Sequence, residues 1–317
     1  MKTLIIGAAG FVGGHLIKEL ESSGHEVVVS DIQAVFGSLG ARGKEAIPID
    51  ILDPDSVLSV LERSKPQWVI LLAAQSSVGR SWEDPSGTIR SNILGPVNVL
   101  EAIRKSSQFP RIILIGSSEE YGIVNNGEEA LTESRSLAPA NPYAMTKTCQ
   151  EDFALLYQKA YSLDIVLTRS FNHIGPGQRL GFVIPDFCSA ITAIERGIHE
   201  PVLKVGNLDA SRDFTDVRDV VRAYRLILER GQTGEVYNVG SGRAIMISEM
   251  LKILIQMAHV PLKVEIDPAK YRPLEVKKIV ADISKISSTV GWRPEFTLEA
   301  SLADTLASYR GDGDQEK

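Results

Sequence analysis

The stretch TLIIGAAGFVG, residues 3–13, decides the fold of this chain. Its first four residues form a short apolar run that predicts a buried strand, and Gly7 ends the run. Apolar residues then recur at helical spacing up to Gly24, at Phe11, Val12, Leu16, Ile17 and Leu20. We therefore expect the chain to open with a strand, a tight glycine turn and a helix.

The three glycines of this turn favour a ligand rather than a turn alone. Gly7 permits the tight turn, Gly10 lets the backbone approach a pyrophosphate, and Gly13 lets the helix pack closely on the strand. The helix N-terminus offers N–H groups and a positive dipole end to the anion. We predict a dinucleotide-binding loop that includes Phe11 and Val12; a tight turn without a ligand is the alternative.

Outward from this loop, strands and helices alternate through the first half of the chain. Further strands are expected at 27–29, 68–72, 111–115 and 165–168, and helices at 54–63, 85–105 and 142–161. The strands are apolar without polar alternation, which is typical of a parallel sheet covered on both faces. The prediction is an α/β fold: a Rossmann-type, doubly wound parallel sheet.

The pattern becomes irregular after Phe171, where a smaller domain is expected. We assign residues 1–171, with about 214–240, to the nucleotide-binding domain. Residues of about 172–213 and 241–310 then form a mostly helical substrate domain, and 311–317 a frayed tail.

Composition limits the other functions. The 317 residues carry a net charge of −6, which argues against binding to nucleic acid or anionic membrane. Cys149 and Cys188 are expected to be reduced thiols, and the five histidines show no metal-binding spacing, so we expect no metal. The apolar stretch Trp68–Ala74 is too short for a membrane span, and the first residues do not form a signal peptide. We expect a cytoplasmic protein.

The end of the second strand indicates which dinucleotide binds. Asp31, followed by Ile32, stands where a carboxylate can accept hydrogen bonds from both ribose hydroxyls. A carboxylate there repels a 2′-phosphate, so NAD(H) is favoured over NADP(H), which stays possible. Asp50 and Ile51 are expected to hold the adenine; a simple helix-start loop is the alternative.

A second pattern supplies acid–base chemistry. Tyr143 and Lys147 lie four residues apart at the start of a predicted helix, hence on one face. A nearby ammonium stabilises phenolate and brings the phenol pKa toward the working range. Ser117, after the strand 111–115, can donate a hydrogen bond to a reacting carbonyl oxygen.

These motifs resemble those of a known family. GAAGFVG at 7–13, Leu72-Ala73-Ala74, SSEEYG at 117–122 and Tyr143-x-x-x-Lys147 are similar to the extended short-chain dehydrogenase/reductase family over nearly the whole chain. The second half resembles its nucleotide-sugar branch, through RSFNHIGPGQ at 169–178, RDFTDV at 212–217 and GWRP at 291–294. Within the branch, the chain looks most like GDP-6-deoxy-D-mannose reductases, then GDP-mannose 4,6-dehydratases.

The resemblance implies roles for these residues. Ser117, Tyr143 and Lys147 would be the catalytic triad: Tyr143 protonates the C4 oxygen of a keto sugar, and Lys147 binds the nicotinamide ribose. Asn92 would support Lys147 through water; a helix-surface amide is the alternative. The remaining expected cofactor contacts are Leu72, Ala73, Ala74, Phe171, His173 and Ile174.

The resemblance also places the sugar nucleotide. Arg212 and Arg272 would bind the diphosphate, where a guanidinium contacts phosphate oxygens in bidentate fashion. Asn172 would bond the proximal phosphate or the sugar, with a turn-forming Asn as the alternative. The other expected substrate contacts are Ser76, Phe182, Val183, Lys204, Val205 and Glu275.

The implied function is NAD(P)H-dependent reduction of GDP-4-keto-6-deoxy-D-mannose to GDP-D-rhamnose by a homodimer built on a four-helix bundle. Glu119 leaves an alternative open, because dehydratases of this branch use a glutamate at the matching position in proton transfer during loss of water. A nucleotide-sugar 4-epimerase and a non-catalytic NAD(P)-sensing module are further alternatives.

Overall fold

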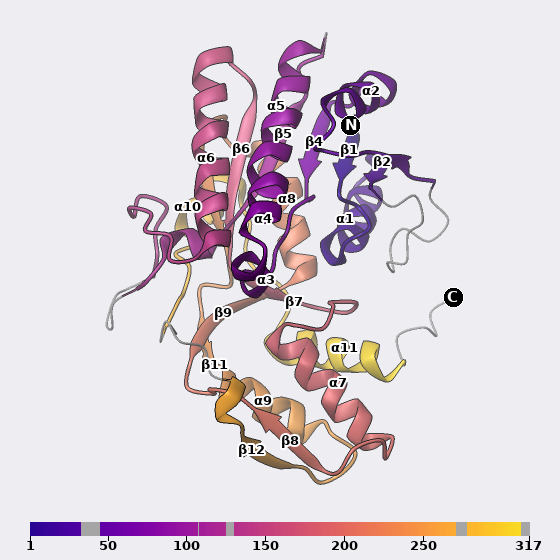
Figure 1. The fold of residues 1–317 in the computed structure, drawn as a ribbon, viewed down its shortest axis with the longest axis vertical. Coiled ribbons are helices and arrows are strands. Elements are labelled where there is room, and N and C mark those ends of the chain that lie inside the picture. The colour runs from indigo at the N-terminus through magenta and orange to yellow at the C-terminus, as the bar shows by residue number, and fades with distance from the viewer. Residues whose placement is uncertain (33–44, 107, 125–129, 271–277, 312–317) are drawn as a thin grey trace.

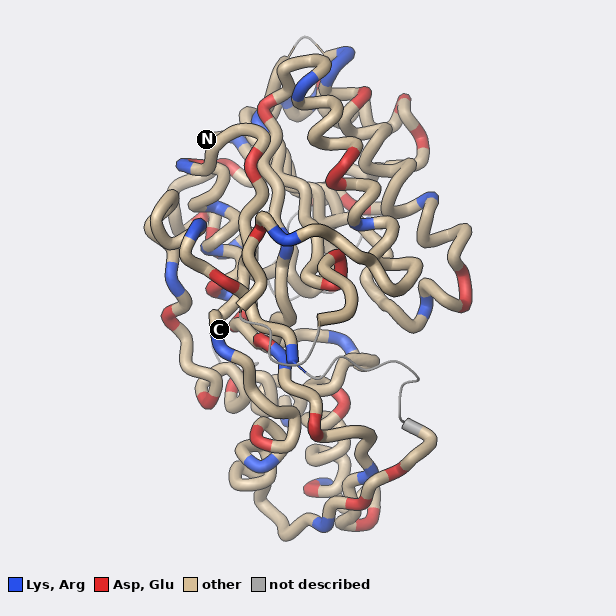
Figure 2. The backbone as a smooth tube through the Cα atoms, turned by 90° about the vertical axis from the view of Figure 1, so that its left-hand side faces the viewer, with Lys and Arg blue, Asp and Glu red and all other residues tan. Residues whose placement is uncertain are grey.

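The computed structural model of the protein describes residues 1–32, 45–106, 108–124, 130–270 and 278–311. Two lobes lie one above the other (Figure 1). The larger holds a seven-stranded sheet between layers of helices, and the smaller is built from helices α7, α9 and α11 with short strands beside them. Acidic and basic residues are interspersed along both lobes (Figure 2), in keeping with the modest net charge of −6.

The large sheet confirms the predicted Rossmann-type, doubly wound fold. Its order is β10-β6-β5-β4-β1-β2-β3, and every neighbouring pair is parallel. Chain order reverses between β1 and β4, so the carboxyl ends of these two strands flank the switch point where such sheets bind ligands. The strands are β1 Lys2–Ile6, β2 Glu26–Asp31, β3 Ile47–Pro48, β4 Trp68–Leu71, β5 Arg111–Ser117, β6 Ile165–Ser170 and β10 Val236–Val239.

Helices cover both faces of this sheet because successive strand residues point to opposite sides. Ile5 packs in the core under α1 (Phe11–Ser22) and α8 (Val217–Arg230). Leu4 packs in the core on the other face, with residues of α2 (Pro54–Ser64), α5 (Gly95–Lys105) and α6 (Pro142–Tyr161). The start of α2 is as expected: Asp53 accepts the Asp55 N–H, and Pro54 is the first helical residue.

The helix expected from Pro85 to Lys105 is interrupted. α4 (Pro85–Ile89) passes into a π-helical turn, η1 (Arg90–Leu94), before α5 begins at Gly95. Pro96 explains the interruption, since a proline ring collides with the carbonyl four residues earlier, here that of Asn92, and offers it no N–H. The widened turn leaves the Asn92 side chain buried. The short helix α3 (Val78–Glu83) precedes α4.

The smaller lobe has its own apolar core, formed mainly by α7 (Val183–Glu195), α9 (Ile247–Gln256) and α11 (Leu298–Arg310). Its strands form two small sheets, ordered β11-β9-β7 and β12-β8. These strands are β7 Asn172–Ile174, β8 Val202–Val205, β9 Ser211–Asp216, β11 Ala244–Met246 and β12 Lys263–Ile266.

The segment before α11 returns to the larger lobe. Ile286 and Val290 of α10 (Ser284–Val290) and Trp292 are buried in the same core as α1 and α8. The domain boundaries predicted from the sequence stay a prediction, and this packing shows that residues 284–292 contact the larger lobe.

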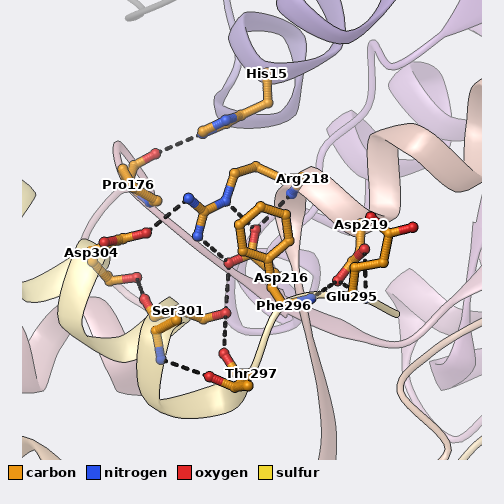
Figure 3. Close-up of polar contacts among 12 residues, drawn as sticks. His15, Pro176, Asp216, Arg218, Asp219, Glu295, Phe296, Thr297, Ser301 and Asp304 are labelled. Atoms are coloured by element: carbon orange, nitrogen blue, oxygen red, sulfur yellow. Dashed lines mark hydrogen bonds and ion pairs between the residues drawn. The ribbon is translucent and has the colours of Figure 1, made fainter. Parts of the chain in front are cut away.

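Charged residues tie the two lobes together at the start of α8 (Figure 3). Asp216 caps α8 and pairs with Arg218 at 2.7 Å, while Arg218 reaches Asp304 of α11 at 2.8 Å. Ser301 of α11 donates to the same Asp216 carboxylate at 2.6 Å. Beside this cluster, His15 of α1 bonds the Pro176 carbonyl at 2.9 Å.

Candidate active site

Close backbone neighbours require glycine at two positions of the loop after β1, Gly7 and Gly13. Gly7 has φ +91°, and a Cβ added there would lie 2.4 Å from the Ala73 nitrogen. A Cβ at Gly13 would lie 2.1 Å from the Ala8 carbonyl oxygen. At Gly10 the nearest described atom would be 3.7 Å away, so the protein itself has room for a side chain. The backbone at Gly10 is therefore open to the pyrophosphate that the sequence predicted there.

The carboxylate expected to select the ribose lies beside this loop. Asp31, at the end of β2, accepts the Ala9 N–H at 2.9 Å, and Ile32 after it is exposed. Asp50 accepts the Leu52 N–H, while the Ile51 carbonyl accepts from Asn98. The contacts of Asp50 and Ile51 hold their own loop, and their part in adenine binding stays a prediction.

Ser117, Tyr143 and Lys147 come together at the carboxyl end of β5. Ser117 is its last residue, and the Ser117 and Tyr143 side chains share a hydrogen bond. Lys147 Nζ donates to the Ile115 carbonyl at 2.8 Å and to Gln150 Oε1 at 3.1 Å. All three side chains are buried, so these groups meet away from bulk water.

Burial shifts the pKa values of Tyr143 and Lys147. It raises the pKa of Tyr143, and the hydrogen bond with Ser117 opposes this only in part. Burial also lowers the pKa of the Lys147 ammonium to about 8, against the field of the Glu120 carboxylate. At neutral pH the phenol therefore carries its proton. The expectation that Lys147 brings the Tyr143 pKa toward the working range was wrong for this structure, because burial outweighs the other effects and raises that pKa.

Glu119 lies two residues after Ser117, near Tyr143. Its Oε2 accepts from Asn141 Nδ2 at 2.9 Å, and Asn141 in turn caps α6 through the Ala144 N–H. The charge of Glu119 also raises the pKa of Tyr143, after the larger effects of burial and of Glu120. The carboxylate is thus close enough to Tyr143 to influence the same chemistry.

Asn92 is not the helix-surface amide that was the alternative interpretation. It is fully buried, and its Oδ1 accepts the Gln75 N–H at 2.8 Å. Its Nδ2 donates to the Gln75 carbonyl and, at 3.1 Å, to Thr146 Oγ1. Asn92 thus joins the segment after β4 to the residue before Lys147, while a water-mediated bond to Lys147 itself stays a prediction.

The other expected cofactor residues lie around the same strand ends. Leu72 and Ala73 both donate their N–H groups to the Ile6 carbonyl, and Ala74 is exposed. His173 stacks on Phe11 with 6.0 Å between ring centroids, and burial lowers its pKa, so it is a packed neutral histidine. Phe171 and Ile174 are buried on either side of it.

The expected substrate residues divide by exposure. Ser76, Asn172, Phe182 and Lys204 are exposed, Val183 is half-buried at the start of α7, and Val205 belongs to the core of the smaller lobe. Arg212 on β9 is half-buried and donates to the Ser211 carbonyl at 2.9 Å. Arg272 and Glu275 lie outside the described residues.

Comparison with known proteins identifies the family. A family model described as GDP-mannose 4,6 dehydratase matches residues 4–305. The chain belongs to this family. It is therefore an NAD(P)-dependent enzyme of the extended short-chain dehydrogenase/reductase type, acting on nucleotide sugars, as its motifs indicated.

Individual relatives cover nearly the whole chain. A GDP-6-deoxy-D-mannose reductase of Pseudomonas aeruginosa is 33% identical over 308 residues, 97% of each chain. The structure of RMD from Pseudomonas aeruginosa complexed with NADPH has a TM-score of 0.87 at 32% identity and covers 98% of this chain and 100% of that one. A Thermus thermophilus UDP-glucose 4-epimerase in complex with NAD also has a TM-score of 0.87, at 28% identity, covering 98% and 99%.

The sequence analysis did not identify the buried charged residues packed next to Ser117, Tyr143 and Lys147. Glu120 is fully buried against Ser117, and Arg169 pairs with Glu151 at 2.6 Å in the same interior. A signal for Glu120 was present, since Ser117-x-x-Glu120 has capping-box spacing and the structure forms that box. The Arg169–Glu151 pair joins a strand to a helix and has no local sequence signal.

Among the residues the structure describes, no cluster of His, Cys, Asp and Glu side chains could hold a metal ion. Over the same part of the chain, no helix has the length and apolar character needed to cross a membrane.

Proposed function

We propose that this enzyme reduces the 4-keto group of GDP-4-keto-6-deoxy-D-mannose to give GDP-6-deoxy-D-mannose, that is GDP-D-rhamnose. The observation that carries the proposal is the gathering of Ser117, Tyr143 and Lys147 at the same edge of the sheet as the Gly10 loop. Similarity to a GDP-6-deoxy-D-mannose reductase over 97% of both chains supports the choice of substrate.

The residues at the strand ends fit a nicotinamide dinucleotide. The backbone at Gly10 is open to a pyrophosphate, and Asp31 lies at the end of the neighbouring strand. When bound, the reduced nicotinamide supplies a hydride to C4. Tyr143 gives its proton to the C4 oxygen, Ser117 donates a hydrogen bond to that oxygen, and the Lys147 charge stabilises the phenolate left behind. Ketone, hydride and proton together make the alcohol.

NADH is the cofactor we propose, because Asp31 opposes a 2′-phosphate. The relatives do not agree on this point, since RMD from Pseudomonas aeruginosa is complexed with NADPH and the Thermus thermophilus epimerase with NAD. The location in the cytoplasm stays a prediction.

A homodimer is proposed through the outer faces of α4, η1 and α6. Exposed apolar side chains lie on these elements, at Ile89, Leu94, Phe153 and Leu156. Together they suit pairing with the same face of a second copy. Sedimentation of Leu156→Glu beside wild type tests it: a dimer that the substitution leaves intact contradicts this interface.

A 4,6-dehydratase acting on GDP-mannose is the second candidate. The description of the matching family model favours it, and so does Glu119, held by Asn141 close to Tyr143. In that reaction Glu119 would exchange protons during loss of water between C5 and C6.

One experiment separates the two. Purified enzyme is mixed with GDP-4-keto-6-deoxy-D-mannose and NADH or NADPH while absorbance of the reduced nicotinamide is followed, and with GDP-mannose alone in parallel. Loss of the signal with formation of a GDP-6-deoxyhexose, abolished in Tyr143→Phe but kept in the exposed control Tyr161→Phe, supports the reductase. A 4-keto-6-deoxy product from GDP-mannose alone refutes it in favour of the dehydratase.

A further inference from the structure

Glu120 is a buried carboxyl group for which the proposed mechanism has no task. Its side chain is wholly inaccessible to solvent, and Oε1 accepts the Ser117 N–H at 2.6 Å. Oε1 also lies so near Gly116 that a Cβ there would come within 2.5 Å of it. Its second oxygen, Oε2, is buried and has no hydrogen-bond partner among the described residues.

This carboxyl group and the Lys147 ammonium are held by the same strand end. Glu120 binds the Ser117 N–H, and Lys147 binds the carbonyl of Ile115, two residues earlier on β5. Gln150 donates to that carbonyl as well, at 3.2 Å, and accepts from Lys147. The arrangement places a buried acid and a buried base behind Ser117 and Tyr143.

The charges around Glu120 come from each element packed on it. Burial raises the pKa of Glu120 to about 8, and the Glu151 carboxylate of α6 adds to this. The Arg169 guanidinium of β6 and the Lys147 ammonium of α6 act in the opposite direction, more weakly than burial does. Arg169 is itself bound to both oxygens of Glu151, and Lys147 is the second cation whose charge acts on Glu120.

We propose that Glu120 is a positioning residue that, once ionised at alkaline pH, keeps Lys147 and Tyr143 protonated and so extends the pH range of the proton-donating, reductive form. The proposal rests on the reductase function above. A negative charge on Glu120 favours the ammonium of Lys147 and disfavours the phenolate of Tyr143. Both effects retain the protons that reduction needs.

The sign of the pH effect follows from this arrangement. Near pH 8 Glu120 and Lys147 compete to release a proton, and whichever loses it first strengthens the hold on the other. Without the carboxylate, Lys147 loses its charge and Tyr143 its proton at lower pH. We expect the alkaline limb of the reduction rate to move down by about one pH unit in Glu120→Gln.

Glu120→Gln is a close test because glutamine keeps an acceptor oxygen for the Ser117 N–H while removing the titratable group. Glu195→Gln is the matched control: this glutamate is also largely buried, but it pairs with Arg310 in the smaller lobe. The first readout is kcat against pH at saturating substrate and cofactor. The expected downward shift in Glu120→Gln, absent in Glu195→Gln, supports the proposal; equal profiles in wild type and Glu120→Gln overturn it, leaving only the helix cap.

A second readout requires no turnover. Infrared spectroscopy of the protein labelled with ¹³C-glutamate detects the carbonyl stretch of a buried protonated carboxylic acid, which we expect to disappear as pH rises through about 8. The band is expected to be missing in Glu120→Gln and retained in Glu120→Asp, should glutamine disturb folding. Its absence from wild type at pH 6 overturns the proposal. If no substrate is turned over, the proposed function fails, and this titration alone decides the role of Glu120.

Discussion

Replacing Asp213 by asparagine would remove one oxygen from a buried carboxylate of the smaller lobe that accepts four hydrogen bonds. Asp213, on β9 next to Arg212, is 1% exposed. Its Oδ1 accepts the N–H and the hydroxyl of Ser241, both at 2.6 Å. Its Oδ2 accepts the N–H groups of Gly242 and Ala281, both at 3.0 Å.

The magnitude follows from counting these donors. Asparagine has the same shape, but one carboxylate oxygen becomes an NH₂ group, which faces either the N–H groups of Gly242 and Ala281 or the N–H and hydroxyl of Ser241. Each buried donor left without an acceptor costs about 1–3 kcal/mol. The Ser241 hydroxyl can turn to accept from the NH₂ group, so the better orientation leaves one N–H donor unmet. The free energy of unfolding is therefore expected to fall by about 1–3 kcal/mol, and Tm by about 2–5 °C for a chain of this length.

Thermal unfolding followed by circular dichroism measures this change. Asp209→Asn is the control, since Asp209 lies on the same segment but is exposed, and a change within about 0.5 kcal/mol is expected there. Because Asp213 fixes the strand that carries Arg212, we also expect weaker binding of the GDP-sugar. If Asp213→Asn melted within 1 °C of wild type, the reasoning from unsatisfied donors would be refuted.

Three further predictions concern the cofactor loop and the triad. Gly10→Ala is expected to melt like wild type but to bind NADH at least tenfold more weakly. Gly13→Ala should lower Tm, since its Cβ would lie 2.1 Å from a carbonyl oxygen. Fluorescence of the bound nucleotide and thermal melts distinguish the two variants. Asp31→Ser should raise kcat/KM for NADPH relative to NADH, and an unchanged ratio would remove Asp31 from cofactor selection. Lys147→Met should abolish reduction yet stabilise the fold at pH 7 by up to about 3 kcal/mol, because the pKa of Lys147 is about 8 in the folded protein and 10.5 ordinarily. Between these two values the unfolded chain binds more protons than the folded one, so the gain should vanish as pH rises from 8 to 10.5. Thermal melts at both ends of this range measure the change.

The larger lobe could be predicted from the sequence because its signals are local. Apolar runs of strand length, the glycine turn and the Asp53–Pro54 helix start each depend on neighbours in the chain. The π turn was not predicted from the sequence. Pro96 does not indicate a π turn by itself, because a proline four residues beyond a carbonyl can also end a helix or kink it. Which of these results depends on packing around Asn92.

The triad was predictable for the same reason, since Tyr143 and Lys147 lie one helical turn apart and Ser117 ends a strand. The environment of these groups was not predictable. Burial of Lys147, the placement of Glu120 behind Ser117 and the pairing of Arg169 with Glu151 all depend on contacts between elements distant in sequence. The pKa directions arise from those contacts, so they could be obtained only from the structure.

The π turn at Arg90–Leu94 changes the rotation of α4 about the helix axis relative to α5. A π turn holds one residue more than an α turn, and each α-helical residue advances about 100° around the axis, so α4 is rotated by about that angle relative to α5. Deleting a single residue between Arg90 and Leu94 would cancel the rotation and turn either Asn92 or the apolar residues of α4 to a different side. The length of this five-residue segment therefore sets which side chains of α4 face the core.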